Sequence, residues 1–131
     1  VIIGTGKTSP WGLTDIKLTY DPPTNSPDEL ATVPEEKADG PDLTICTMQK
    51  APARQLPNLK GIPIVVIAGE ASYHRLYDHC TVKYLNQAGA KAEWMPLDSK
   101  GVHGNGHMVM IEKNNLEVAK VIDDWAKKNV K

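Results

Sequence analysis

One continuous apolar run decides the fold class: Ile62-Pro63-Ile64-Val65-Val66-Ile67-Ala68, which Gly69 ends. A run rich in β-branched residues, with no polar alternation, is typical of a parallel strand that is covered on both faces. Residues 75–88 follow with apolar side chains at helical spacing, and Gly89 is suited to end such a helix. We therefore expect a strand over 62–68 and a helix over 75–88.

The alternation of strand and helix continues to the C-terminus. Residues 92–97 predict a second strand, and a glycine-rich loop over 101–107 separates it from a last helix. Asn114, with Glu117 three residues later, forms the capping-box pattern that starts a helix. The apolar stripe of this helix consists of Val118, Val121, Ile122 and Trp125. This order predicts the end of a parallel α/β sheet with right-handed crossovers, and two strands alone need neighbours from elsewhere.

Residues 1–60 differ in composition from residues 61–131. Nine of the ten prolines lie between Pro10 and Pro63. Proline fixes φ, removes a backbone donor and disfavours helix at the residue before it. We expect a loop-rich excursion over 1–60, either packed as a lid or binding segment on a larger scaffold or disordered. Apolar side chains that favour packing are Trp11, Leu13, Ile16, Leu18 and Tyr20.

Composition excludes several classes of protein. The 131 residues suit one domain, and 15 Lys and Arg against 16 Asp and Glu give a net charge of −1, which argues against a globally basic nucleic-acid binder. The longest apolar run is far shorter than the ~18–20 residues of a membrane span. Cys46 and Cys80 could pair, but two cysteines define neither a disulfide framework nor a zinc site. The segment Gly4-Thr5-Gly6-Lys7-Thr8 lacks the first glycine of a phosphate-binding loop.

The histidines differ in what their positions indicate. His103 and His107 are four residues apart, but the glycines between them make a shared zinc on a helix implausible. His107 follows the last predicted strand, where open α/β sheets place their active sites, and an imidazole suits a general base. Position alone leaves a general base and an ordinary loop histidine equally open. His74 and His79 fit surface polarity and partial burial at the predicted helix.

Three segments resemble the C-terminus of α/β-hydrolase-fold serine esterases: 101–108 (Gly-Val-His-Gly-Asn-Gly-His-Met), 112–115 (Glu-Lys-Asn-Asn) and 122–125 (Ile-Asp-Asp-Trp). The resemblance is to a bacterial and fungal subgroup whose triad histidine lies in a Gly-Asn-x-His-Met loop. Residues 10–23 are similar to the excursion after the sixth strand of that subgroup. The two predicted strands then correspond to its seventh and eighth.

This resemblance implies an α/β fold, the C-terminal part of an α/β-hydrolase parallel sheet preceded by a proline-rich excursion. Residues 1–60 would be the excursion, and residues 61–131 the strand-helix-strand-helix part of a core that a separate chain completes. No cofactor and no metal is implied.

The resemblance also assigns residues. His107 corresponds to the triad histidine, while no Gly-x-Ser-x-Gly nucleophile elbow occurs in the chain. The acid of the subgroup is a Glu at the end of the sixth strand, which would fall before Val1. Glu70, just after the predicted strand over 62–68, remains another candidate acid, the alternative being an ordinary strand-end carboxylate. Trp11 is a candidate for lining the substrate pocket or for packing the excursion onto the core.

We therefore expect the C-terminal chain of a carboxylic ester hydrolase with a Ser-His-Glu triad, active only with a partner chain. The partner would be the N-terminal polypeptide of the same precursor, cut before Val1, which supplies the Ser and the Glu. The substrate would be a small-molecule ester, with neither nucleic acid nor a membrane span involved. Because the family has many secreted members, the resemblance favours an extracellular location for this protein. The alternatives are a non-catalytic binding or structural subunit with this fold, or a hydrolase-fold enzyme with other chemistry.

Overall fold

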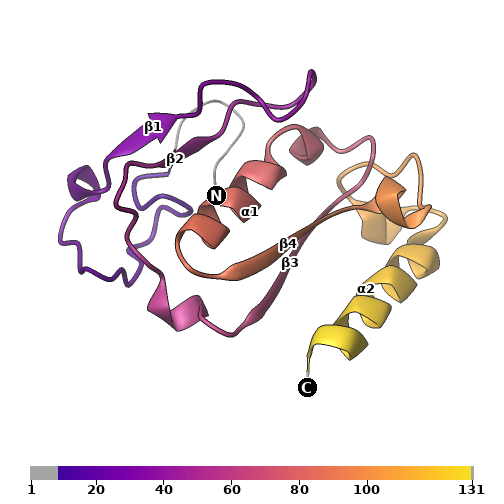
Figure 1. Cartoon of the computed structure of the whole chain (residues 1–131). Helices are drawn as coiled ribbons and strands as arrows, with labels where there is room; N and C mark the ends of the chain where they lie inside the picture. Colours follow the sequence, from indigo (N-terminus) through magenta and orange to yellow (C-terminus); the bar gives the residue numbers. More distant parts are fainter. Residues whose placement is uncertain (1–8, 131) are drawn as a thin grey trace.

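The computed structural model describes residues 9–130 of the chain, so the segment Gly4–Thr8 lies outside the described residues (Figure 1). None of the helices in this described part is long and apolar enough to cross a membrane. The strands and α-helices are β1 (Thr32–Pro34), β2 (Thr47–Gln49), β3 (Pro63–Ala68), α1 (Asp78–Gln87), β4 (Lys91–Pro96) and α2 (Asn115–Asn129).

Strands β3 and β4 form a parallel pair, and α1 connects them as a crossover helix. The register runs from Pro63 opposite Lys91 to Ala68 opposite Pro96. This confirms both predicted strands and their parallel direction. The result is a small mixed α/β structure that is compatible with part of a larger parallel sheet.

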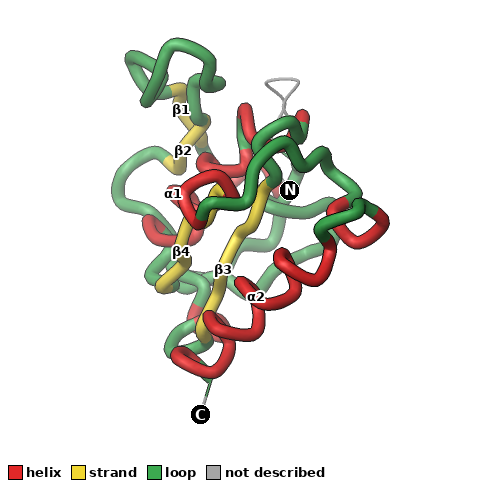
Figure 2. The backbone as a smooth tube through the Cα atoms, turned by 90° about the vertical axis from the view of Figure 1, so that its right-hand side faces the viewer, coloured by secondary structure: helices red, strands yellow, loops and turns green. Residues whose placement is uncertain are grey.

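The two helices contact opposite faces of the β3–β4 pair. Ile64 and Ala92 pack with the buried Leu85 of α1, whereas Ile67 packs with the buried Val118 of α2. Successive residues of a strand point to opposite faces, so Ile64 and Ile67, which are three positions apart, face different layers. Figure 2 shows α2 running beside β3, with α1 behind the strands.

Strand β3 is less covered than its sequence predicts. Its residues from Ile64 to Ile67 are half-buried rather than buried, although helices lie on both faces. Within residues 9–130, β3 pairs only with β4, so its second edge has no strand partner. A strand of this composition normally has neighbours on both edges, and such an edge can accept another strand.

The proline-rich half is packed onto α1 rather than disordered. Residues 9–60 contain only the short antiparallel pair β1–β2 and 3₁₀ turns, as the proline content predicts. The buried side chains of Tyr20, Leu30 and Leu56 contact Leu85 of α1 and Ala88 just after it. Of the five apolar side chains that the sequence favours for packing, Ile16 is the exception, since it is 77% exposed.

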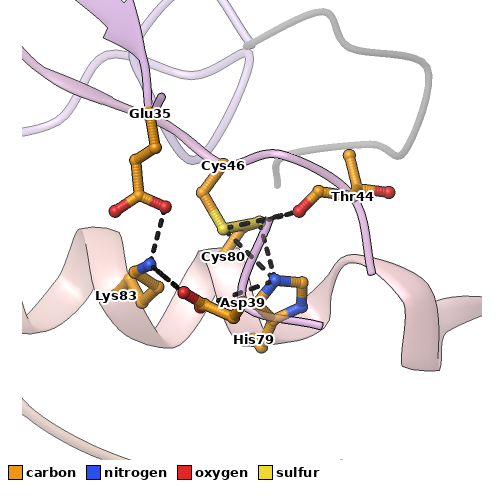
Figure 3. Close-up of polar contacts among 7 residues, drawn as sticks. All are labelled: Glu35, Asp39, Thr44, Cys46, His79, Cys80 and Lys83. Carbon is orange, nitrogen blue, oxygen red and sulfur yellow. Dashed lines mark hydrogen bonds and ion pairs between the residues drawn. A yellow bond between two sulfur atoms is a disulfide. The ribbon is translucent and has the colours of Figure 1, made fainter. Parts of the chain in front are cut away.

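A disulfide joins the two halves of the chain. Cys46, next to β2, is bonded to Cys80 of α1, and their Cα atoms are 5.1 Å apart (Figure 3). The sequence left this pairing open. Because the closed loop spans 34 residues, the bond restricts the unfolded chain considerably and holds the excursion against α1.

One predicted helix start and one predicted helix cap need correction. The predicted helix over 75–88 begins as α1 only at Asp78, because residues Tyr73–Leu76 form a separate 3₁₀ turn capped by Ser72. The predicted start of α2 is confirmed, because Asn114 is its N-cap, but the side-chain bonds of the capping box are not formed. The Asn114 side chain makes no capping hydrogen bond, since its amide pairs with the side chain of Asn105 instead.

A polar cluster surrounds the disulfide at the surface of α1 (Figure 3). His79 is 5% exposed, with Nε2 3.3 Å from Cys46 Sγ and 3.9 Å from an Asp39 carboxylate oxygen. Lys83 donates to Asp39 and to Glu35, which ties the excursion to α1. Burial lowers the pKa of His79 below its usual 6.5, and the opposing effect of Asp39 is smaller.

His79 will make the protein less stable as the pH falls from 7 to 5. Above pH 6.5 the imidazole is mostly neutral in both the folded and the unfolded protein. Below pH 6.5 the unfolded chain binds a proton more readily than the folded protein, so protonation favours unfolding. The slope contributed by one such group approaches about 1.4 kcal/mol per pH unit. Urea unfolding at pH 5, 6 and 7 will show a flatter dependence for His79→Gln. The same dependence in His79→Gln as in the wild type would contradict this prediction.

Candidate active site

His107 lies on the loop between β4 and α2, beyond the carboxyl ends of the parallel strands. Its imidazole stacks on that of His74, with ring centroids 4.1 Å apart and planes inclined by 11°. Tyr73 contacts the same ring at a centroid distance of 4.9 Å. No hydrogen bond reaches a ring nitrogen of His107 from residues 9–130, and its side chain is exposed. The ring edges are therefore accessible.

The loop that carries His107 is fastened to the end of β3. The Ala71 N–H donates to the carbonyl of Asn105 at 2.9 Å. Gly69, directly after β3, allows this approach, because a Cβ there would lie 2.2 Å from the Asn105 oxygen and 2.5 Å from the Gly106 oxygen. The glycine that ends the apolar run is thus required by the His107 loop.

Asn105 fastens the same loop to the start of α2. Its side chain is fully buried and donates to Glu112 at 2.8 Å. It also forms a reciprocal amide pair with Asn114, at 2.7 and 2.9 Å. The other Glu112 oxygen accepts from the Gly106 N–H at 2.7 Å. The Gly-Asn-x-His sequence therefore places a buried, fully bonded amide two residues before His107.

Asn105→Ala will destabilise the protein by about 2–4 kcal/mol, because it leaves Glu112 and Asn114 without their buried partner. Equilibrium urea unfolding measures the loss. Asn115→Ala is the control at the start of α2, since the half-buried Asn115 side chain donates to the Met110 carbonyl and takes no part in the Asn105 cluster. A loss of stability in Asn115→Ala as large as that in Asn105→Ala would contradict the role of Asn105 in holding the loop to α2.

Glu70 contacts the other histidine of this loop. Its Oε2 accepts from the Gly104 N–H at 2.9 Å and lies 3.2 Å from His103 Nδ1. Among the described residues, no hydrogen bond joins Glu70 to His107. The structure thus brings Glu70 to the same loop as His107, but against His103.

Trp11 packs on the core of the excursion. It is half-buried against the cluster that contains Tyr20, and its carbonyl accepts from the Tyr20 hydroxyl at 2.8 Å. The ammonium of Lys17 lies 5.6 Å from its ring centroid. Trp11 does not line the cavity beside His74 described next.

A cavity of about 510 Å³ lies on the side of His74, between the excursion and the segment that precedes α1. The excursion contributes Ser9, Thr14, Asp15 and Ile16, and the segment leading into α1 contributes Tyr73, His74 and Tyr77. Two of these rings, Tyr73 and His74, also contact His107. The proline-rich half therefore walls a space next to the candidate catalytic histidine.

His74 was missed as a site residue by sequence reasoning, which placed it on the protein surface. Its nearness to His107 depends on the 3₁₀ turn after β3 and on the loop after β4 meeting at one end of the sheet. The carboxyl ends of adjacent parallel strands lie at the same end of the sheet. This rule is the signal that could have indicated that His74 and His107 lie close together.

Comparison with known proteins gives one informative similarity. A protein named probable secreted lipase phiG, from Fungal sp. (strain ATCC 74256), is 41% identical to this chain over 127 residues. The match covers 95% of this chain, which spans about a third (34%) of the length of that relative. No family model matches the chain, and no solved structure does so. The similarity is consistent with the hydrolase resemblance of the sequence and with the chain being part of a larger protein.

Proposed function

We propose that this chain is the C-terminal portion of a serine esterase that cleaves carboxylic esters, and that His107 is its triad histidine. The observation that carries the proposal is the presentation of His107 beyond the carboxyl ends of β3 and β4, on a loop held by Gly69 and Asn105. The similarity to a protein named a lipase supports the reaction class, and the word secreted in that name supports an extracellular location.

In this mechanism a serine attacks the ester carbonyl, and His107 takes the hydroxyl proton. His107 then passes that proton to the leaving alcohol. A carboxylate that accepts a hydrogen bond from the other ring nitrogen holds the imidazole in place. Both nitrogens of His107 are free of hydrogen bonds from residues 9–130, as these two roles require. The serines of the chain lie outside any Gly-x-Ser-x-Gly sequence, so the nucleophile would come from the remainder of the protein.

The acid would also come from that remainder. Glu70 is engaged by His103 and by the Gly104 N–H, which favours a Glu at the end of the sixth strand over Glu70. We propose that the remainder is the N-terminal polypeptide of the same precursor. Two features support its attachment: the second edge of β3 has no strand partner in the described part, and Ile111 and Leu116 are exposed beside the His107 loop.

The experiment is labelling of the complete protein, that is, this chain together with the remainder, by a fluorescent fluorophosphonate that reacts with activated serines. Denaturing electrophoresis should place the label on the remainder and none on the 14.3 kDa chain, and the same preparation should hydrolyse p-nitrophenyl esters. Folded protein that neither takes the label nor hydrolyses esters would contradict the proposal. That result would favour a non-catalytic binding subunit with this fold.

A further inference from the structure

Four rings gather at the candidate site, and His74 lies at their centre. Its ring contacts that of Tyr73 at a centroid distance of 4.5 Å, that of Tyr77 at 4.9 Å and that of His107 at 4.1 Å. Only the contact with His107 is a parallel stack, with the planes 11° apart. Aromatic rings prefer defined relative orientations, so a stacked contact of this kind restricts how the His107 ring can turn.

His74 is fixed from several directions. Its Nδ1 lies 3.1 Å from both carboxylate oxygens of Asp78, one helical turn along, and its backbone N–H donates to the Ser72 hydroxyl at 3.2 Å. The side chains of His74 and Asp78 are 22% and 13% exposed. His107 has no such attachment, since its contacts with residues 9–130 are with the rings of Tyr73 and His74.

We infer that His74 is a positioning residue, a flat platform fixed by Asp78 that sets the plane of the His107 imidazole for proton transfer. The inference rests on the proposed function, because it requires His107 to be the general base. Stacking uses the face of the His107 ring and leaves both nitrogens, at its edge, open to the nucleophile and the acid. Small errors in the placement of a catalytic group cost up to ~100-fold in rate, so a platform of this kind has a measurable effect.

The test compares three substitutions at His74 in the complete protein. His74→Ala should lower the kcat for p-nitrophenyl butyrate about 10- to 50-fold, with KM within about twofold, because the substrate still binds while the base is misplaced. His74→Phe keeps a flat ring and should restore kcat to within about threefold of the wild type. His74→Leu keeps apolar volume without a flat ring and should remain as slow as His74→Ala.

A substitution at a second position, Asp78, tests the inference without removing the His74 ring. Asp78→Asn keeps the stacked ring but weakens its attachment, and we expect a fall in kcat of about three- to fivefold. The thermal midpoint of each variant shows that it is folded. An unchanged kcat in His74→Ala, or rescue by His74→Leu as complete as by His74→Phe, overturns the inference. If His107→Ala itself keeps full turnover, the proposed function fails; if only the His74 variants have no effect, the platform alone fails.

Discussion

Replacing His107 by alanine will lower the ester-hydrolysis kcat of the complete protein by about 10⁴-fold or more, with little change in KM. The imidazole accepts the serine proton and returns it to the leaving alcohol, and removal of the triad base from serine hydrolases has effects of this size. The rate of fluorophosphonate labelling should fall in parallel, because the serine is no longer activated. Initial rates with p-nitrophenyl butyrate, normalised to folded protein, measure the effect.

His103→Ala is the control, since His103 is an exposed histidine on the same loop. Its turnover should stay within about twofold of the wild type. The thermal midpoint of His107→Ala should fall by only a few degrees, because the exposed His107 ring loses no more than its contacts with the rings of His74 and Tyr73. Near-normal turnover in His107→Ala would remove it from the triad. A collapse of activity in His103→Ala alone would transfer the role to the His103–Glu70 pair, whose atoms lie 3.2 Å apart.

The strands and helices of the second half follow from local signals. The apolar run over 62–68 and the helical spacing after it need no partner to be recognised, and they appear as β3 and α1 at nearly the predicted bounds. The start of α2 shows where local signals fail. Asn114 has a good capping sequence, but its side chain gains a reciprocal pair with the buried Asn105, which lies nine residues earlier. A tertiary contact outcompetes the local one.

The excursion shows a different limit. Its prolines predict loops, and loops are found, but composition does not indicate which surface a loop packs against. The decisive contacts are distant in sequence: the Tyr20 hydroxyl lies 3.0 Å from that of Tyr84, and Cys46 is bonded to Cys80. His74 and His107 are likewise brought together only by the ends of two parallel strands. The sequence therefore points to His107 as a candidate, while the residues that hold it in place emerge from the fold.

Gly69→Ala will both destabilise the protein and displace the loop that carries His107. The added Cβ would lie 2.2 Å from the Asn105 oxygen and 2.5 Å from the Gly106 oxygen, which are backbone atoms. The Asn105 oxygen cannot move away without losing the hydrogen bond from the Ala71 N–H. We expect a loss of about 3 kcal/mol or more in the free energy of unfolding, from overpacking of a tight backbone contact.

The same substitution should lower kcat by about 100-fold or more in protein that remains folded, because the displaced carbonyls immediately precede His107. Assays well below the thermal midpoint separate this effect from unfolding. Gly40→Ala is the matched control: its Cβ would come no closer than 3.4 Å, to the Leu43 side chain, so stability should change by less than about 1 kcal/mol. Wild-type stability and turnover in Gly69→Ala would contradict the close approach of β3 to the His107 loop. A loss of kcat beyond that of an equally destabilised variant elsewhere would show that the end of β3 sets the position of His107.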